Sequence, residues 1–181
     1  LVKCSKDANS ELYYAIPWSY GSLGFLVCAE IKIVPCKDYV HLTYITYTSK
    51  QALVDRFTEE SLKPFDEAYE FIEGLMYSEQ EGVLMLGNFA DKVPAGTTRN
   101  ALNNFWKPWF YEHVRSILKQ NKEQEEYIPL RHYYHRHTRS FFWEMEQIVP
   151  FGNSTWFRYL LGWMSPPEIS LIKLTETEAI H

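Results

Sequence analysis

The sequence predicts an α+β fold in two parts, with a proline at the boundary between them. Apolar and charged residues alternate over residues 25–34 with the two-residue period of a half-buried strand. Pro35 ends that run, and a fresh strand-like segment follows at residues 39–48. From there the order strand, helix, hairpin, helix is that of a ferredoxin-like β-α-β-β-α layer. We therefore expect one domain to end within residues 1–37 and another to occupy residues 38–181.

The first part begins with a short helix and a glycine-rich turn. Ser10 is a favourable N-cap for a helix over residues 11–16, and Pro17 removes the amide needed to continue it. The helix is therefore predicted to be shorter than two turns. Residues 21–24 then place two glycines before the predicted strand, which begins at Gly24. Taken alone, this spacing is more often a tight turn than a cofactor loop.

The second part is predicted to begin with a strand that leads directly into a helix. Residues 39–48 are rich in β-branched and aromatic side chains, which favour strands. Ser49 then caps a helix that carries Ala52, Leu53 and Phe57 on one face. The apolar face of this helix is expected to cover the sheet.

A hairpin and a second helix complete the predicted layer. Residues 69–77 and 83–89 read as paired strands whose polar turn ends at Gly82. A proline suits the start of a helix over residues 108–120. The layer then lacks one strand, for which residues 169–174 are our candidate.

An insert of dense aromatic and basic residues, residues 125–167, separates the second helix from that candidate strand. Aromatic residues make up 17% of the whole chain, which suggests a large flat ligand or an interface as well as a core. The net charge of -5 argues against nucleic acid as a main partner, because phosphate binding needs a surplus of Lys and Arg. No apolar run approaches the roughly 20 residues that span a bilayer. We expect the chain to be a fragment cut at both ends, because it opens inside a strand and stops where a helix begins.

The most informative pattern lies in residues 11–35. An acidic-Leu-aromatic helix leads through two glycines to a Gly-hydrophobic-Val strand, and this order resembles the end of the FAD-binding domain in vanillyl-alcohol-oxidase-type (PCMH-type) flavoproteins. Glycines before a strand let the backbone approach a bulky ligand and leave amides free for its oxygens. By that resemblance, FAD would be contacted, mostly through backbone, by Gly21, Ser22, Gly24, Phe25 and Leu26.

A second resemblance rests on six segments that run in order along nearly the whole chain. They are Phe71-Ile-Glu-Gly74, Lys107-Pro-Trp-Phe110, Glu126-Tyr-Ile-Pro129, Arg131-His-Tyr-Tyr-His-Arg-His-Thr-Arg139, Pro150-Phe-Gly152 and Phe157-Arg-Tyr-Leu-Leu-Gly-Trp163. Together they are similar to the delta(24)-sterol reductases, the Diminuto/Dwarf1 group. By this resemblance, residues 1–37 would end the FAD-binding domain and residues 38–181 would begin the cap, or substrate, domain.

The resemblance implies that the full-length protein saturates the C24–C25 double bond of sterol side chains, with FAD as hydride carrier and NADPH as reductant. It also implies association with the endoplasmic reticulum membrane through an anchor outside this chain, with the catalytic part facing the cytosol. The alkene is isolated from any carbonyl, so a proton must accompany the hydride. The site therefore needs an acid, a wall that tolerates positive charge, and a dry slot.

The aromatic and basic insert supplies the candidates for that acid and that wall. We expect the catalytic groups to be Tyr133, Tyr134, His135 and His137. If their segment were a strand, His135 and His137 would share one face and Tyr134 the other. The substrate-binding candidates are Trp106, Trp109 and Trp143. Each of these residues is also open to a plain packing or surface role.

Other interpretations of the insert remain open. A zinc site at its histidines is rejected, because neither a carboxylate nor a cysteine nearby completes a ligand set. Basic residues between aromatic ones are also typical of RNA-binding modules, although the net acidity counts against that function. A flavoenzyme of the same superfamily could act on another substrate. Residues 156–163 fit an interfacial membrane segment and a buried amphipathic helix equally well.

Overall fold

The computed structural model describes residues 1–120, 123–140 and 143–164. The chain divides into two compact units, one of residues 1–35 and one from residue 36 on, and each is described by itself. The division falls beside Pro35, where the sequence predicts a boundary. The assignment of the first unit to a flavin domain and of the second to a cap domain stays a prediction.

The first unit contains one short helix followed by a tight turn. Helix α1 (Ser10–Ala15) passes directly into the 3-10 helix η1 (Ile16–Trp18), so α1 is shorter than two turns, as predicted. Its N-cap is Asn9 in a left-handed conformation, not Ser10, which is the first helical residue.

The predicted strand over residues 25–34 is not formed in the structure. These residues are all exposed, and no described residue pairs with them in a sheet. A strand needs a neighbour for its amides and carbonyls, and apolar alternation alone cannot supply one. The prediction was therefore wrong for the described chain: the segment has the pattern of a strand without a partner.

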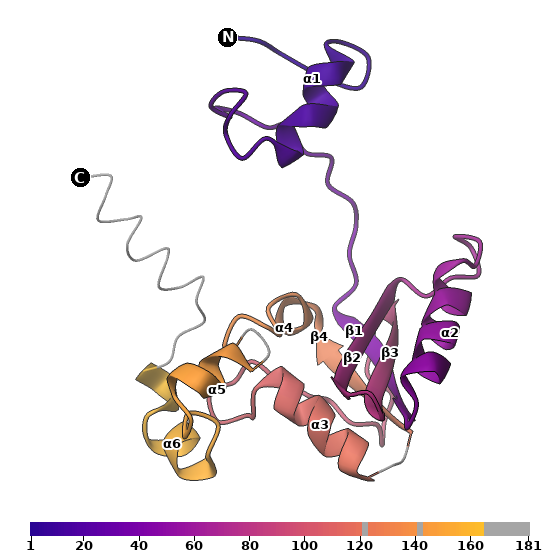
Figure 1. The fold of residues 1–181 in the computed structure, drawn as a ribbon, viewed down its shortest axis with the longest axis vertical. Helices are drawn as coiled ribbons and strands as arrows, with labels where there is room; N and C mark the ends of the chain where they lie inside the picture. Colours follow the sequence, from indigo (N-terminus) through magenta and orange to yellow (C-terminus); the bar gives the residue numbers. More distant parts are fainter. Residues whose placement is uncertain (121–122, 141–142, 165–181) are drawn as a thin grey trace. The chain divides into compact units, whose positions relative to one another are not determined.

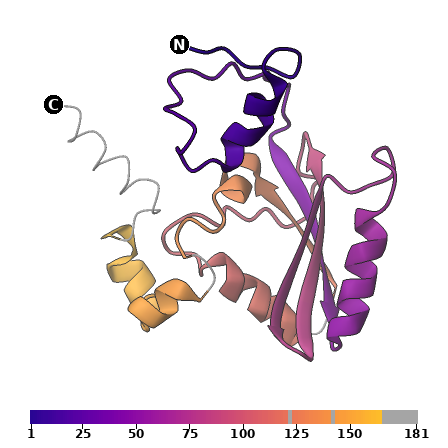
Figure 2. The same ribbon diagram turned by 45° about the horizontal axis from the view of Figure 1, so that its top comes forward.

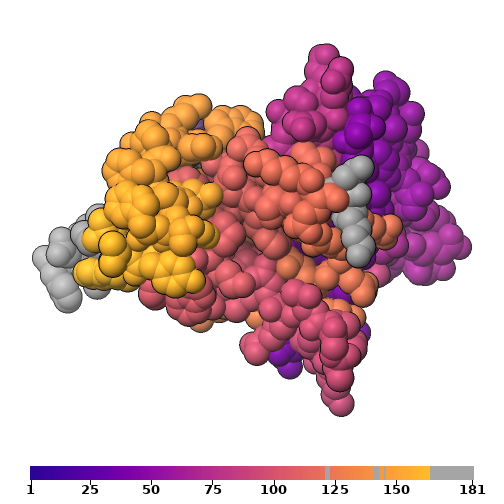
Figure 3. Space-filling model, turned by 90° about the horizontal axis from the view of Figure 1, so that it is seen from below, coloured from indigo at the N-terminus to yellow at the C-terminus, as the bar shows by residue number. Residues whose placement is uncertain are grey.

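The second unit is built on a four-stranded antiparallel sheet with the strand order β2-β3-β1-β4 (Figures 1 and 2). Its elements are β1 (Tyr39–Tyr47), α2 (Lys50–Ser61), β2 (Phe71–Ser78), β3 (Glu81–Ala90), α3 (Phe110–Gln120), β4 (Gln124–Pro129), α4 (Leu130–Tyr134), α5 (Glu144–Ile148), α6 (Thr155–Leu160) and the 3-10 helix η2 (Gly162–Met164). The predicted order β-α-β-β-α is thus found, and the Ser49 hydroxyl accepts a hydrogen bond from the Ala52 amide at the start of α2, as expected for its cap. The segment from α5 to η2 forms a lobe beside α3 (Figure 3).

The fourth strand lies in a different place from the one predicted. Strand β4 follows α3 almost directly and pairs with β1, with Ile128 opposite Val40. It was predicted to be part of the aromatic insert, whereas the predicted strand at residues 169–174 lies outside the described residues. Glu125 and Glu126 hid this strand, because charged residues are depleted in strands.

Helices α2 and α3 lie on opposite faces of the sheet, so the predicted ferredoxin-like element order is found without the one-sided helix layer of a ferredoxin-like fold (Figures 1 and 2). Leu53 of α2 packs against Leu84 and Leu86. The residues of α3 pack in the other cluster, with Val83 and Met85. Successive side chains of β3 point to opposite faces, so both faces are covered. Accordingly, residues 82–87 are buried without interruption.

The α3 face carries the larger core. Val40, Leu42 and Tyr44 of β1 point into it and are fully buried, and Phe110, Val114 and Ile117 of α3 cover them. No helix within the described residues is long and apolar enough to cross a bilayer.

Candidate functional site

Two carboxylates point from the sheet into the α3 face. Strand alternation places Glu73 of β2 with Phe71 and Leu75 on this face, and it places Glu126 of β4 opposite Leu42. Both glutamates sit in strands that otherwise supply apolar core. Glu126 is buried, and the side chain of Glu73 is 19% exposed. A carboxylate withdrawn from water must be paired or hydrogen-bonded, so each organises the polar groups around it.

Glu73 binds two basic residues of the predicted catalytic segment. One carboxylate oxygen accepts hydrogen bonds from Nε and Nη2 of Arg136, at 3.0 and 2.7 Å. The other lies 3.0 Å from Nε2 of His137. Burial alone would raise the pKa of the Glu73 carboxyl. The hydrogen bond from His137 and the charge of Arg136 outweigh burial, and the net effect is a pKa below the ordinary value.

Tyr133 and His137 are brought together around this ion pair, whereas Tyr134 and His135 are not. The Arg136 guanidinium lies 4.1 Å from the centre of the Tyr133 ring, a cation–π contact, and His137 meets Phe110 edge to face. Tyr133 is buried, and burial raises the pKa of its hydroxyl to about 12. Tyr134 is 58% exposed.

The predicted alternation of His135 and His137 along a strand is wrong. Residues Leu130–Tyr134 form helix α4, and His135 is its C-cap, with its backbone N–H donating to the Arg131 carbonyl. Pro129 ends β4, and the chain turns away from the sheet into a helical turn, where the two-residue period no longer applies.

The three predicted substrate tryptophans do not form one wall. Trp109 is buried, its backbone N–H donates to Asn153, and its ring lies where a side chain at Gly152 would be, so it packs the lobe onto the sheet. Trp106 is half-exposed and meets Phe105 edge to face. Trp143 alone of the three lines the larger described cavity.

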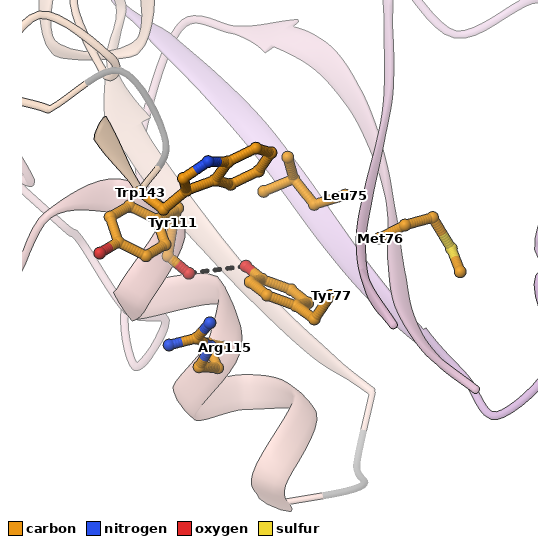
Figure 4. Close-up of a pocket in the computed structure, with 6 residues that line it drawn as sticks. All are labelled: Leu75, Met76, Tyr77, Tyr111, Arg115 and Trp143. Carbon is orange, nitrogen blue, oxygen red and sulfur yellow. Dashed lines mark hydrogen bonds between the residues drawn. The ribbon is translucent and has the colours of Figure 1, made fainter. Parts of the chain in front are cut away.

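That cavity has a volume of about 360 Å³ and lies between β2 and α3 (Figure 4). It is lined by Leu75, Met76, Tyr77, Tyr111, Arg115 and Trp143. The Tyr77 hydroxyl donates to the Tyr111 carbonyl, and the Tyr111 hydroxyl donates to Glu146. The Arg115 guanidinium lies over both tyrosine rings. The result is an apolar slot with aromatic walls and one cation, in the size range of ligand pockets.

Sequence reasoning missed Arg139 and Glu126 as organising residues. Arg139 is 6% exposed, and burial lowers the pKa of its guanidinium to about 10. It donates three hydrogen bonds to the backbone oxygens of Asn104, Lys107 and Phe105. This fixes the loop before α3. The Glu126 carboxylate accepts hydrogen bonds from the side chains of Tyr44 and Asn100 and lies 3.0 Å from Nε2 of His113. A charged residue inside an apolar strand pattern was the sequence feature that could have indicated its role.

The loop predicted to contact FAD fits that role in its backbone. Gly21 and Gly24 have φ values of 78° and 140°, and a side chain at either would meet no described atom within 4 Å. Ser22 closes the turn through its hydroxyl, which donates to the Ser19 carbonyl. Phe25 and Leu26 are exposed. The loop therefore offers open backbone of the kind that close approach of a flavin requires. Among the described residues, no cluster of His, Cys, Asp or Glu could hold a metal ion.

The chain is similar along its whole length to reductases that act on sterols, the delta(24)-sterol reductases. The chain is 52% identical over 180 residues, 99% of its length, to Delta(24)-sterol reductase of Macaca fascicularis, and 48% identical over 190 residues to that of Arabidopsis thaliana. The predicted resemblance to delta(24)-sterol reductases is confirmed over the whole chain, which spans 34% of the length of these relatives. A weaker match, 26% identical over 84 residues, covers 46% of the chain and 16% of Cytokinin dehydrogenase 4 of Oryza sativa subsp. japonica. No protein-family model and no solved structure matches the chain.

The Glu73 ion pair leads to a prediction about stability. Glu73→Gln should lower the free energy of unfolding by about 2 kcal/mol, because it removes the partly buried charge that accepts two hydrogen bonds from Arg136. Glu125→Gln is the matched control: its partner is His41, its side chain is 58% exposed, and its loss should cost under about 1 kcal/mol. Denaturant unfolding of both variants measures the difference.

The same contact sets a pH dependence. Because the pKa of Glu73 is lowered in the folded protein, its stabilising contribution is complete above the ordinary value of 4.5 and is lost as the pH falls through the folded value. Glu73→Gln should therefore flatten the acid limb of the stability curve. An unchanged acid limb together with unchanged stability would show that the ion pair contributes nothing.

Proposed function

We propose that this chain is part of an FAD-dependent oxidoreductase that reduces the C24–C25 double bond of sterol side chains with NADPH as reductant. The observation that carries the proposal is the 52% identity to a Delta(24)-sterol reductase over 99% of the chain. The dehydrogenase named in the weaker match also supports redox chemistry. Because the chain spans about a third of its relatives, the activity belongs to the full-length protein.

In this proposal the first unit holds the cofactor through the backbone of the loop that contains Gly21, Ser22, Gly24, Phe25 and Leu26. When bound, FAD supplies the hydride. The open space beside Gly21 and Gly24 supports this assignment, since no described side chain competes for it. The residues of the loop would orient the cofactor through backbone amides, which every substitution except proline retains.

We propose further that the sterol side chain enters the cavity beside Trp143. The apolar side chain of Leu75 helps to exclude water, and the rings of Tyr77 and Tyr111 offer faces to an electron-poor carbon. A ring face that no other cation occupies stabilises a carbon that gains positive charge by roughly 2 kcal/mol. The Arg115 guanidinium already lies over the rings of Tyr77 and Tyr111, so its charge would repel a positively charged substrate carbon at the same ring faces. The apolar wall and the ring faces favour this slot for an alkene.

Location and partners follow the same proposal. We place the full-length protein at the endoplasmic reticulum membrane, facing the cytosol, with a sterol as its substrate. The alternative RNA-binding function depended on arginines free to hold phosphates, but Arg136 binds Glu73 and Arg139 binds backbone carbonyls. These contacts favour the enzyme. A flavoenzyme of the same superfamily with another substrate is the remaining alternative.

The full-length protein tests the function directly. It should purify yellow, with flavin absorbance that NADPH bleaches and that a sterol with a C24–C25 double bond restores, giving the saturated sterol. A colourless protein that binds RNA would support the alternative. Flavin absorbance that another electron acceptor restores, but a sterol does not, would support a flavoenzyme of the same superfamily with a different substrate.

Gly24→Val should remove most of the flavin from the full-length protein, because the branched side chain would occupy the open space that the cofactor needs. Gly96→Val is the matched control. Gly96 also has a positive φ, 84°, and open space around it, but it lies in the second unit, so its variant carries similar backbone strain and should keep its flavin. Flavin content is read from absorbance per protein. Equal content in both variants would remove the loop from the cofactor site.

Trp143→Ala should raise the KM for sterol about tenfold or more, because it removes an aromatic wall of the cavity and the apolar contact it gives. Trp163→Ala is the control: this tryptophan is similarly exposed, at 66% against 59%, but does not line the cavity. Steady-state turnover against sterol concentration separates the two. Identical KM values would show that the substrate binds elsewhere.

A further inference from the structure

The lobe from α5 to η2 carries an exposed apolar surface. It lies beside α3, at the opposite end of the second unit from α2 (Figures 1 and 3). Five of its large apolar side chains are each more than half exposed, and we call them the lobe face: Ile148, Phe151, Trp156, Tyr159 and Leu160. Large apolar side chains that gather on a surface mark a site that contacts a partner or a membrane.

The exposed side of α6 is the reverse of what a surface helix in water shows. Trp156, Tyr159 and Leu160 are spaced at i, i+3 and i+4, so they lie on one face of the helix. A surface helix normally turns its charged and polar residues outward. The Phe151 ring stacks on the Trp156 ring, with 5.9 Å between their centres, and extends the same face. Helix α6 has no buried residue, which favours an interfacial segment over a buried amphipathic helix.

The inward side of the lobe is already occupied. A side chain at Gly152 would meet the ring of Trp109, and one at Gly162 would meet the backbone of Phe105 at 3.0 Å. The Asn153 side chain accepts a hydrogen bond from the Trp109 backbone N–H. These close contacts fix the lobe against the loop before α3. The lobe face is therefore held outward, and no described residue covers it.

The charge of the lobe suits the headgroup region of a bilayer. Arg158 is the only charged residue between Ile148 and Met164. Among the described residues, no carboxylate lies within ion-pair distance of Arg158, and its Nε has no hydrogen-bond partner. An arginine can lay its stem along apolar side chains and hold a lipid phosphate with its guanidinium. Tryptophan and tyrosine are the aromatic residues that collect at the same depth of a bilayer.

The lobe adjoins the cavity proposed for the sterol side chain. Trp143 lines that cavity and directly precedes α5, and the hydroxyl of Tyr111, another lining residue, donates to Glu146 of α5. The other described cavity, of about 150 Å³, is lined by residues that include Asn100 and His113, and no residue of the lobe lines it. A sterol is a membrane lipid, so a bilayer surface beside the larger cavity would place the substrate near its site.

We propose that the lobe face lies on a bilayer, with its apolar side chains at the boundary between headgroups and acyl chains. The inference rests on the proposed function, which supplies a membrane lipid as the substrate. Helix α6 has six residues, against the roughly 20 that span a bilayer, so the contact is with one leaflet only. This contact is additional to the anchor expected outside this chain.

Photocrosslinking in the full-length protein tests the contact without reading activity. A benzophenone amino acid replaces Trp156 in one variant and Leu160 in another, and each is reconstituted into vesicles of phosphatidylcholine and phosphatidylserine. Phe65 is the matched control position, because it is 99% exposed and follows α2 at the opposite end of the second unit. After irradiation, mass spectrometry measures lipid adducts per protein. Adducts at positions 156 and 160 should exceed those at position 65 about tenfold or more.

The possible results are distinct. Crosslinks from positions 156 and 160 to polypeptide, of the same chain or of a second copy, would overturn the inference, because protein then covers the lobe face. Equal lipid adducts at all three positions, or none at any, would overturn it as well. If one labelled variant does not fold, the other position decides.

Sterol turnover by the unlabelled protein in the same vesicles separates this inference from the proposed function. Turnover without lipid adducts at the lobe face would overturn the inference and leave the proposed function intact. Lipid adducts at the lobe face of a protein that never reduces sterol would overturn the proposed function and leave the membrane contact.

Discussion

The requirement that a buried charge be paired governs the α3 face of the sheet. Two carboxylates occupy positions that strand alternation assigns to the core, and each is surrounded by donors from distant parts of the chain. Glu73 draws in the segment after α4, and Glu126 draws in α3 and the loop before it. A core made of apolar residues alone would not specify which loop lies where, whereas these hydrogen bonds do.

The same requirement explains the dense aromatic and basic composition of the segment after β4. Arg136 is held between a carboxylate and the rings of Tyr133 and Phe110, and Arg139 is held by backbone carbonyls. Aromatic rings cover the apolar stems of these residues while the charged groups find partners. A composition that reads as a surface for nucleic acid is here largely turned inward.

Local patterns predicted local structure well in the second unit. The β-branched and aromatic run of β1, the Ser49 cap and the hairpin strands are encoded by neighbouring residues, and all are found. The placement of α2 and α3 on opposite faces depends on which side of the sheet each helix meets, and periodicity within a helix cannot show that. Strand β4 was hidden by glutamates whose partners lie in other elements. The segment at residues 25–34 shows the converse case, a strand pattern without a neighbouring strand.

The opposite placement of the two helices has a topological consequence. Strands β1 and β2 run parallel to each other, as do β3 and β4, and α2 and α3 make the two crossovers in opposite directions along the sheet. Two such crossovers have the same handedness only when their helices lie on the same face of the sheet. Because α2 and α3 lie on opposite faces, one crossover is left-handed, which is rare in protein sheets. The layer therefore lacks the internal two-fold symmetry of a repeated β-α-β unit. One side of the sheet is a plain helix-covered surface, and both described cavities and both core carboxylates fall on the other.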